Sequence, residues 1–204
     1  REGQFRVLND SLSWLGEDQI KRHAPFALLA ARLARDSFDY ELCNKLLASA
    51  ESWQQREDPK QWQAFEGAFA AMRAQVSVSR GQILKAKEYA QEALDLLPPD
   101  QDSERIAAQL VIGETSFCLG ELDQAMHHME AVEKATLARQ DIPNAAWAQC
   151  QQTEIAFANG LLKKAAALQS RAQQLIEEHH LVGLPISEFI YRLKGQLQWE
   201  AGDL

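Results

Sequence analysis

Small and apolar positions recur along the chain in a unit that repeats about every forty residues. Each unit begins with Gly and has an aliphatic residue two positions later and, where complete, Ala five positions later; the units begin at Gly81, Gly120, Gly160 and Gly202. A Gly at the end of a helix supplies a positive φ that other residues adopt only at a cost, and a small Ala lets the next helix pack closely. The pattern therefore predicts pairs of antiparallel helices, repeated along the chain.

Apolar residues at helical spacing mark the individual helices, and prolines mark several first turns. We expect helices over residues 3–15, 25–35, 38–55, 59–79, 82–97, 102–119, 121–139, 143–159, 161–178 and 185–201. Phe38 takes the place of the glycine in the first pair, which is therefore a degenerate repeat. Since no segment reads as a strand and no linker separates domains, we predict an all-α, right-handed superhelix of tetratricopeptide-like hairpins, with residues 1–204 as a single domain.

Composition excludes several classes of function. The chain has 46% apolar and 25% charged residues, which is typical of a globular protein, and it lacks the apolar run that a membrane span needs. Its net charge of -8 argues against contact with nucleic acid by this segment. Three Cys without a C-x-x-C pair fit a reducing, cytoplasmic location. Because no glycine-rich nucleotide loop or nucleophile motif occurs, we expect neither an enzyme nor a cofactor in this segment.

Candidate chemistry lies in the first helix of each pair, if that helix lines a concave groove. Its inward positions would then recur three, six, ten and thirteen residues before the turn glycine. These positions hold a polar row six before (Gln75, Glu114, Glu154, Gln196), aromatic rings three before (Phe117, Phe157, Trp199) and thirteen before (Trp147, Phe189), and Arg192 ten before. A polar row bordered by rings can bind hydroxyls and stack on apolar ring faces, so a carbohydrate site is one interpretation. The alternative is that the rings pack between repeats and the polar row is solvated.

Histidines and most carboxylates are poorer candidates. His127-His128 and His179-His180 are adjacent pairs, which point about 100° apart on a helix and cannot form the ligand face of a helical zinc site. We interpret them as surface histidines and expect no metal. Helical carboxylates such as Glu133 are expected to face solvent.

Short motifs then follow one another in a familiar order and spacing. They include Pro25-Phe26-x-Leu28-Leu29, Met72-Arg73-Ala74-Gln75-Val76, Leu96-Leu97-Pro98-Pro99, Gly120-Glu121-Leu122, Gln151-Gln152-Thr153-Glu154-Ile155 and Leu184-Pro185-x3-Glu188-Phe189. Their order resembles the helical-repeat sensor region of the MalT-like family of large ATP-dependent LuxR-type transcription regulators. The resemblance covers nearly the whole chain, most specifically residues 58–200.

The resemblance implies a function that spacing alone does not. Members of this family carry an ATPase, a winged-helix segment, this superhelical sensor and a C-terminal helix-turn-helix that binds DNA. A small-molecule inducer, a malto-oligosaccharide such as maltotriose, would bind the sensor and control ATP-dependent self-association. We therefore expect a piece of a larger regulator, with the array continuing past Leu204. The alternative is a scaffold that docks a regulatory protein or another protomer.

Overall fold

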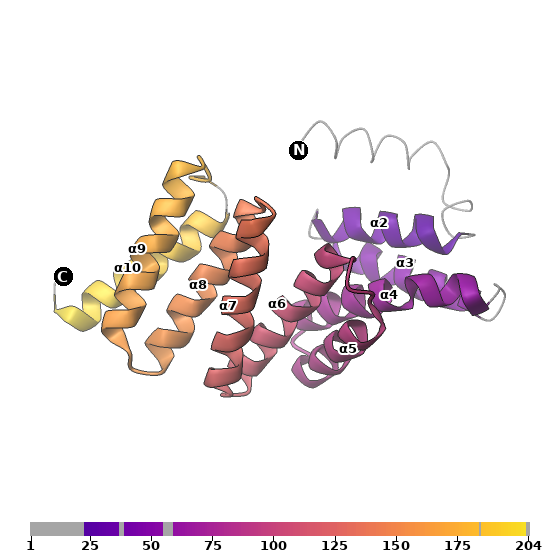
Figure 1. Ribbon diagram of the computed structural model, residues 1–204, viewed down its shortest axis with the longest axis horizontal. Helices are drawn as coiled ribbons and strands as arrows, with labels where there is room; N and C mark the ends of the chain where they lie inside the picture. The colour runs from indigo at the N-terminus through magenta and orange to yellow at the C-terminus, as the bar shows by residue number, and fades with distance from the viewer. Residues whose placement is uncertain (1–22, 37–38, 55–58, 184, 203–204) are drawn as a thin grey trace. The chain divides into compact units, whose positions relative to one another are not determined.

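The computed structural model describes residues 23–36, 39–54, 59–183 and 185–202 (Figure 1). Within these ranges all regular structure is helical: α2 (Ala24–Asp36), α3 (Tyr40–Gln54), α4 (Pro59–Ser79), α5 (Ile83–Leu96), α6 (Asp102–Cys118), α7 (Leu122–Ala138), α8 (Ile142–Ala158), α9 (Leu162–Glu178) and α10 (Pro185–Ala201). The all-α class and the order of the helices are confirmed, and no helix end is displaced by more than two residues. The expected helix over 3–15 lies outside the described residues.

The helices form two compact units, residues 1–111 and 112–204, with the boundary inside α6. In the first unit α2 packs on α3 and α4, and α4 packs on α5. In the second unit α7 packs on α8, α8 on α9, and α10 on both α8 and α9. Neighbours in sequence are therefore neighbours in space within each unit, as expected for repeated hairpins. A single domain over 1–204 stays a prediction.

The turn glycines adopt the conformation that the repeat predicts. Gly81, Gly120 and Gly160 end the first helices of their pairs with φ of 69°, 78° and 71°. After each glycine, the next amide donates back to the carbonyl five residues earlier, at 2.9, 2.8 and 2.9 Å. This is the Schellman bond, which pairs a carbonyl that the helix end would otherwise leave exposed.

Two second helices end in the same turn without a glycine. Gln140 follows α7 with φ 57° and His180 follows α9 with φ 55°. The bond pattern is repeated, because the Asp141 amide donates to Thr136 O and the Leu181 amide to Ile176 O, both at 2.9 Å. His180 thus lies in a turn beside the helix cap His179, and both side chains are exposed.

Small residues let the paired helices approach closely. Ala86, Ala125 and Ala165, each five residues after a turn glycine, are all fully buried. Larger apolar side chains are buried as well, among them Met129 and Ile155 in the second unit. Burying a side chain of that size contributes about 1.5–3 kcal/mol relative to leaving it in water.

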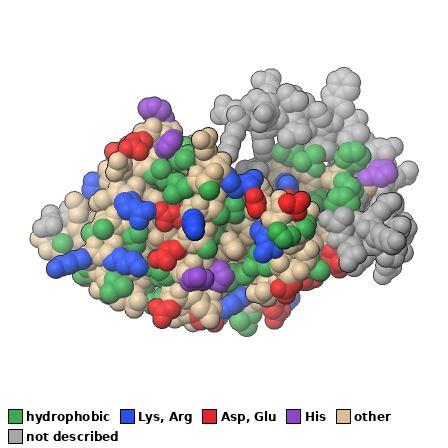
Figure 2. Space-filling model, viewed as in Figure 1, with side chains coloured by type: hydrophobic (Ala, Val, Ile, Leu, Met, Phe, Trp, Pro, Cys, Tyr) green, Lys and Arg blue, Asp and Glu red, His purple; other side chains and the backbone are tan. Residues whose placement is uncertain are grey.

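Charged side chains cover the outside of the helices. On the face shown in Figure 2, acidic and basic groups alternate with each other and with uncharged ones rather than forming one field of a single sign. None of the described helices is both long and apolar enough to cross a membrane.

One acidic side chain, Glu133, departs from this arrangement, and the expectation that it faces solvent is wrong. Glu133 of α7 is buried, with 8% of its surface exposed. Gln149 donates to its Oε1 at 2.8 Å and Gln152 to its Oε2 at 2.7 Å, both from α8, and Arg171 of α9 pairs with it as well. These donors satisfy the carboxylate inside the second unit and connect three helices.

Candidate functional site

The candidate site residues fall in both units. Gln75 lies on α4 in the first unit, where its side-chain oxygen accepts a hydrogen bond from Arg35 of α2. The other nine lie in the second unit, on α6, α8 and α10.

An aromatic pair lies at the centre of the group in the second unit. Trp147 of α8 and Phe189 of α10 stack with their ring centroids 5.4 Å apart and their planes inclined by 26°. The guanidinium carbon of Arg192, also on α10, lies 4.6 Å from the centroid of the Phe189 ring. Trp147 and Phe189 occupy the same position before successive turn glycines, so the repeat itself brings the rings together. We call Trp147, Phe189 and Arg192 the aromatic platform.

Polar side chains of the predicted row surround the aromatic platform. Trp147 Nε1 donates to Glu114 Oε1 at 2.9 Å, which ties α6 to α8. Arg192 Nη2 donates to Glu154 Oε1 at 3.0 Å, and its Nη1 donates to Gln196 Oε1 at 2.9 Å. Three members of the row therefore adjoin the aromatic platform. A ligand here would meet flat rings, two carboxylates and a guanidinium.

The two carboxylates act on two neighbouring cysteine thiols. Burial raises the pKa of Glu114, and the hydrogen bond from Trp147 lowers it by less. Burial, then Glu154, raises the pKa of the Cys150 thiol to about 12. Burial followed by Glu114 and Glu154 raises the pKa of Cys118. Both thiols are therefore protonated at neutral pH and are poor nucleophiles.

A pH dependence follows from the raised pKa of Glu114. Between its ordinary value of 4.5 and the raised value, the folded chain binds more protons than the unfolded chain. The contribution of this carboxyl to stability therefore falls as pH rises through that window and stays low above it. Glu114→Gln removes the effect, while the Gln oxygen can still accept from Trp147.

We expect the free energy of unfolding of the wild type to fall relative to that of Glu114→Gln as pH increases above 4.5. Urea unfolding of both proteins from about pH 4 to about pH 8 measures the difference between their free energies of unfolding. The contributions of the other titratable groups cancel, because both proteins contain them. If the difference in free energy of unfolding between the two proteins stays constant across this range, burial does not destabilise the charged form of Glu114.

The remaining aromatic candidates lie in different surroundings. Phe157 is half-buried and packs on a cluster built from Ala156, Ala165 and Leu168, with Leu197 of α10 beside it. Phe117 is half-buried as well, whereas Trp199 is 72% exposed. Packing between helices, the alternative considered from the sequence, therefore accounts for the position of Phe157.

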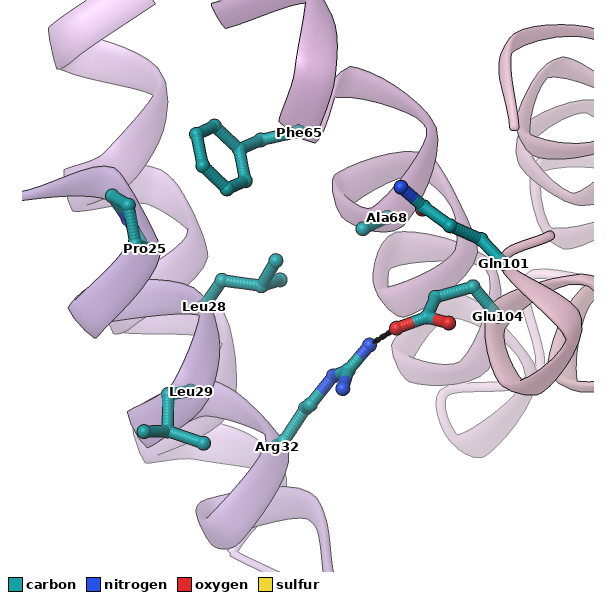
Figure 3. A pocket seen from close by; sticks show the side chains of 8 residues that line it. All are labelled: Pro25, Leu28, Leu29, Arg32, Phe65, Ala68, Gln101 and Glu104. Carbon is teal, nitrogen blue, oxygen red and sulfur yellow. Dashed lines mark hydrogen bonds and ion pairs between the residues drawn. The ribbon is translucent and has the colours of Figure 1, made fainter. Parts of the chain in front are cut away.

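The first unit contains a hollow that the sequence analysis did not identify. Its volume is about 220 Å³, and α2, α4 and the beginning of α6 contribute its lining. Figure 3 shows Phe65 and Leu28 pointing toward one another across it, while Arg32 reaches Glu104 and forms an ion pair. Arg32 lies six residues before Phe38, so the rule for the polar row would have found it in the degenerate repeat. Glu104 carries no such signal, because it lies outside the recurring positions.

Metal ligands do not gather in the part of the chain that the structure describes. No group of three or more His, Cys, Asp or Glu side chains lies close enough there to hold an ion. His127 and His128 meet edge to face, with ring centroids 5.8 Å apart. Their arrangement is that of a surface pair rather than of a ligand face.

Sequence comparison places this chain beside one family of regulators. The family model described as MalT-like TPR region matches residues 67–204. The HTH-type transcriptional regulator MalT of Serratia proteamaculans is 35% identical over 196 residues, covering 96% of this chain and 22% of that protein. MalT of Vibrio campbellii is 34% identical over 198 residues, covering 97% and 22%. The chain thus spans about a fifth of the length of the curated relatives that it matches.

Solved structures share the fold at low identity. BtubC (BKLC) from P. vanneervenii superposes with a TM-score of 0.68 at 13% identity, covering 99% of this chain and 84% of that one. Kinesin light chain TPR-like repeats from Podospora anserina give a TM-score of 0.52 at 16% identity, covering 88% of each chain. At identities this low, the structural similarity shows the fold alone. The similarity confirms that the helices form tetratricopeptide-like hairpins.

Proposed function

The chain belongs to the MalT-like TPR region family, and from that premise we propose that it is the part of a transcriptional regulator that senses a small effector. The proposed effector is a malto-oligosaccharide such as maltotriose. The observation that carries the proposal is the stack of Trp147 on Phe189 with Glu114 and Glu154 beside it. In the whole cytoplasmic regulator, other segments would bind ATP and DNA, and effector binding here would control association with other protomers.

The chemistry of a sugar ring matches this arrangement. A pyranose presents apolar C–H groups on its faces and hydroxyls at its edge, so it can stack on a ring and donate to a carboxylate at once. The side chains of Glu154 and Arg192 are 26% and 44% exposed, so a ligand can reach both. A hydrogen bond to a charged group contributes about 1.5–3 kcal/mol, which makes these two residues the main expected source of affinity.

A ligand at this site would also act on the conformation of the second unit. The aromatic platform and its carboxylates come from α6, α8 and α10, the first helices of successive pairs. A ligand that contacts all three favours the arrangement in which their contacts fit it best, and it shifts the equilibrium by its differential affinity. In this proposal that change in helix packing is the signal passed to the rest of the regulator.

Calorimetric titration of the chain with maltotriose tests the proposal. Arg192→Ala and Glu154→Gln are each expected to weaken binding by about tenfold or more, equivalent to about 1.4 kcal/mol. Glu178→Gln, which removes a carboxylate from the exposed end of α9, serves as the matched control and should leave the affinity unchanged.

Two results would count against the proposal. The first is an unaltered affinity in both Arg192→Ala and Glu154→Gln. The second is no heat at millimolar maltotriose together with a concentration-dependent increase in mass by sedimentation, which would favour the scaffold role.

A further inference from the structure

A second hollow in the first unit has a net positive charge, whereas carboxylates outnumber cations around the aromatic platform. It has a volume of about 170 Å³, and α3, the end of α4 and the beginning of α5 line it. Its lining includes Arg73, Arg80 and Lys85, with Glu51 as the acidic member. We call it the basic hollow; it shares no lining residue with the hollow around Arg32.

The positive charge of the basic hollow exceeds its negative charge by two. Arg73 pairs with Glu51, and its guanidinium lies 5.5 Å from the centroid of the Tyr89 ring, so these two charges are matched within the hollow. Arg80 and Lys85 are exposed and supply the excess. Arg80 also acts weakly on Glu41 of α3, but Lys45 already pairs with that carboxylate at 2.7 Å. The excess stands out in a chain whose net charge is -8.

Backbone groups add to this positive character. α5 begins beside the hollow, because its N-cap Gln82 and its third residue Lys85 both line it. Gln82 makes no side-chain cap bond, and no acidic residue lies in the first turn. The first amides of a helix lack intrahelical acceptors and carry a partial positive charge. The hydroxyl of Ser77, a residue only 6% exposed, provides a neutral donor in the lining.

We propose that the basic hollow binds a small molecule bearing a phosphate monoester or a free phosphate. A phosphate of this kind carries a charge of about -1.5 to -2 at neutral pH, which matches the excess of two. Arg80 and Lys85 contact the phosphate together with the first turn of α5, and Arg73 stays with Glu51 as the wall of the hollow. This site is independent of the proposed effector site, because none of its lining residues belongs to the second unit.

Calorimetric titration at low salt with inorganic phosphate and, separately, with glucose 6-phosphate tests the proposal and distinguishes the two sources. Arg80→Gln/Lys85→Gln is expected to weaken binding of the better probe by about tenfold or more, and Lys85→Gln alone by a smaller factor. Lys163→Gln/Lys164→Gln is the matched control, because it removes two exposed charges from the first turn of α9 and should leave binding unchanged.

The outcomes separate clearly. If glucose 6-phosphate binds more tightly than inorganic phosphate, the ligand of the basic hollow is an organic phosphate. If the two bind equally, the ligand is the free ion. Either result supports the proposal. Failure of both probes to bind at about 10 mM, or an equal loss of affinity in the Lys163→Gln/Lys164→Gln control, would overturn it. Tight binding of a short oligonucleotide with the same dependence on Arg80 and Lys85 would overturn it in favour of a nucleic-acid contact. Unaltered maltotriose affinity in Arg80→Gln/Lys85→Gln keeps the two sites distinct.

Discussion

Replacing Glu133 by alanine is expected to lower the free energy of unfolding by about 1–3 kcal/mol for each buried amide donor that loses its acceptor. Glu133 is 8% exposed, and its carboxylate accepts hydrogen bonds from Gln149 and Gln152. Removing it leaves both amides buried without that acceptor and leaves Arg171 without its counter-charge. The loss therefore includes the desolvation of the donors as well as the bonds themselves.

Urea unfolding followed by circular dichroism measures this effect. Glu130→Ala provides the control on the same helix, because Glu130 has a side chain that is 55% exposed and lies 3.8 Å from Lys164. Exposed pairs of that kind contribute about 0–1 kcal/mol. Equal destabilisation by the two substitutions would show that the buried network does not hold α7, α8 and α9 together.

The second large effect is expected where α6 meets α7, at Gly113 and Met129. Met129 is fully buried, and Met129→Ala is expected to cost about 2–5 kcal/mol through lost burial and a cavity. A Cβ at Gly113 would lie 2.6 Å from Met129 Cε and 3.3 Å from its Sδ. Gly113→Ala gains about 1 kcal/mol of helix propensity. Overpacking costs about 1–3 kcal/mol, but the closest atom is the end of the flexible Met129 side chain, which can shift. We therefore expect Gly113→Ala to change stability much less than Met129→Ala does.

Combining the two substitutions tests the contact itself. The Gly113→Ala methyl group occupies space that Met129→Ala opens, so the double variant should lose less stability than the sum of the single variants. Gly195→Ala in α10 is the control, because a Cβ there meets nothing within 4 Å. It is expected to stabilise the chain by about 1 kcal/mol. Strict additivity of the first two changes would mean that the two side chains do not meet.

The sequence was most informative where one residue type is clearly best suited to a local backbone conformation. Glycine is the residue best suited to a left-handed turn, so Gly81, Gly120 and Gly160 located the helix ends to within a residue or two. The same register placed Trp147 and Phe189 at equivalent positions of neighbouring repeats, and the structure brings them into contact. Repetition thus allowed local spacing to specify one contact between residues far apart in the sequence.

Contacts without a repeated signal could not be predicted in this way. Glu133 looks like any other helical carboxylate in the sequence, because its donors lie on different helices. Gln140 and His180 adopt the left-handed conformation although neither is glycine, so the sequence indicated that the helices end there but not this conformation. The basic hollow depends on Arg80 and Lys85 flanking a turn, which becomes meaningful only when α3 is placed against α4 and α5.

The central claim, that the aromatic platform binds a malto-oligosaccharide, is tested most directly by the indole N–H resonance of Trp147 during titration with maltotriose. The resonance is assigned by comparison with Trp147→Phe, and it reports on the bond to Glu114. We expect it to shift and to saturate with the same dissociation constant that calorimetry gives. A resonance that stays fixed while maltotriose binds would place the sugar elsewhere and contradict the claim.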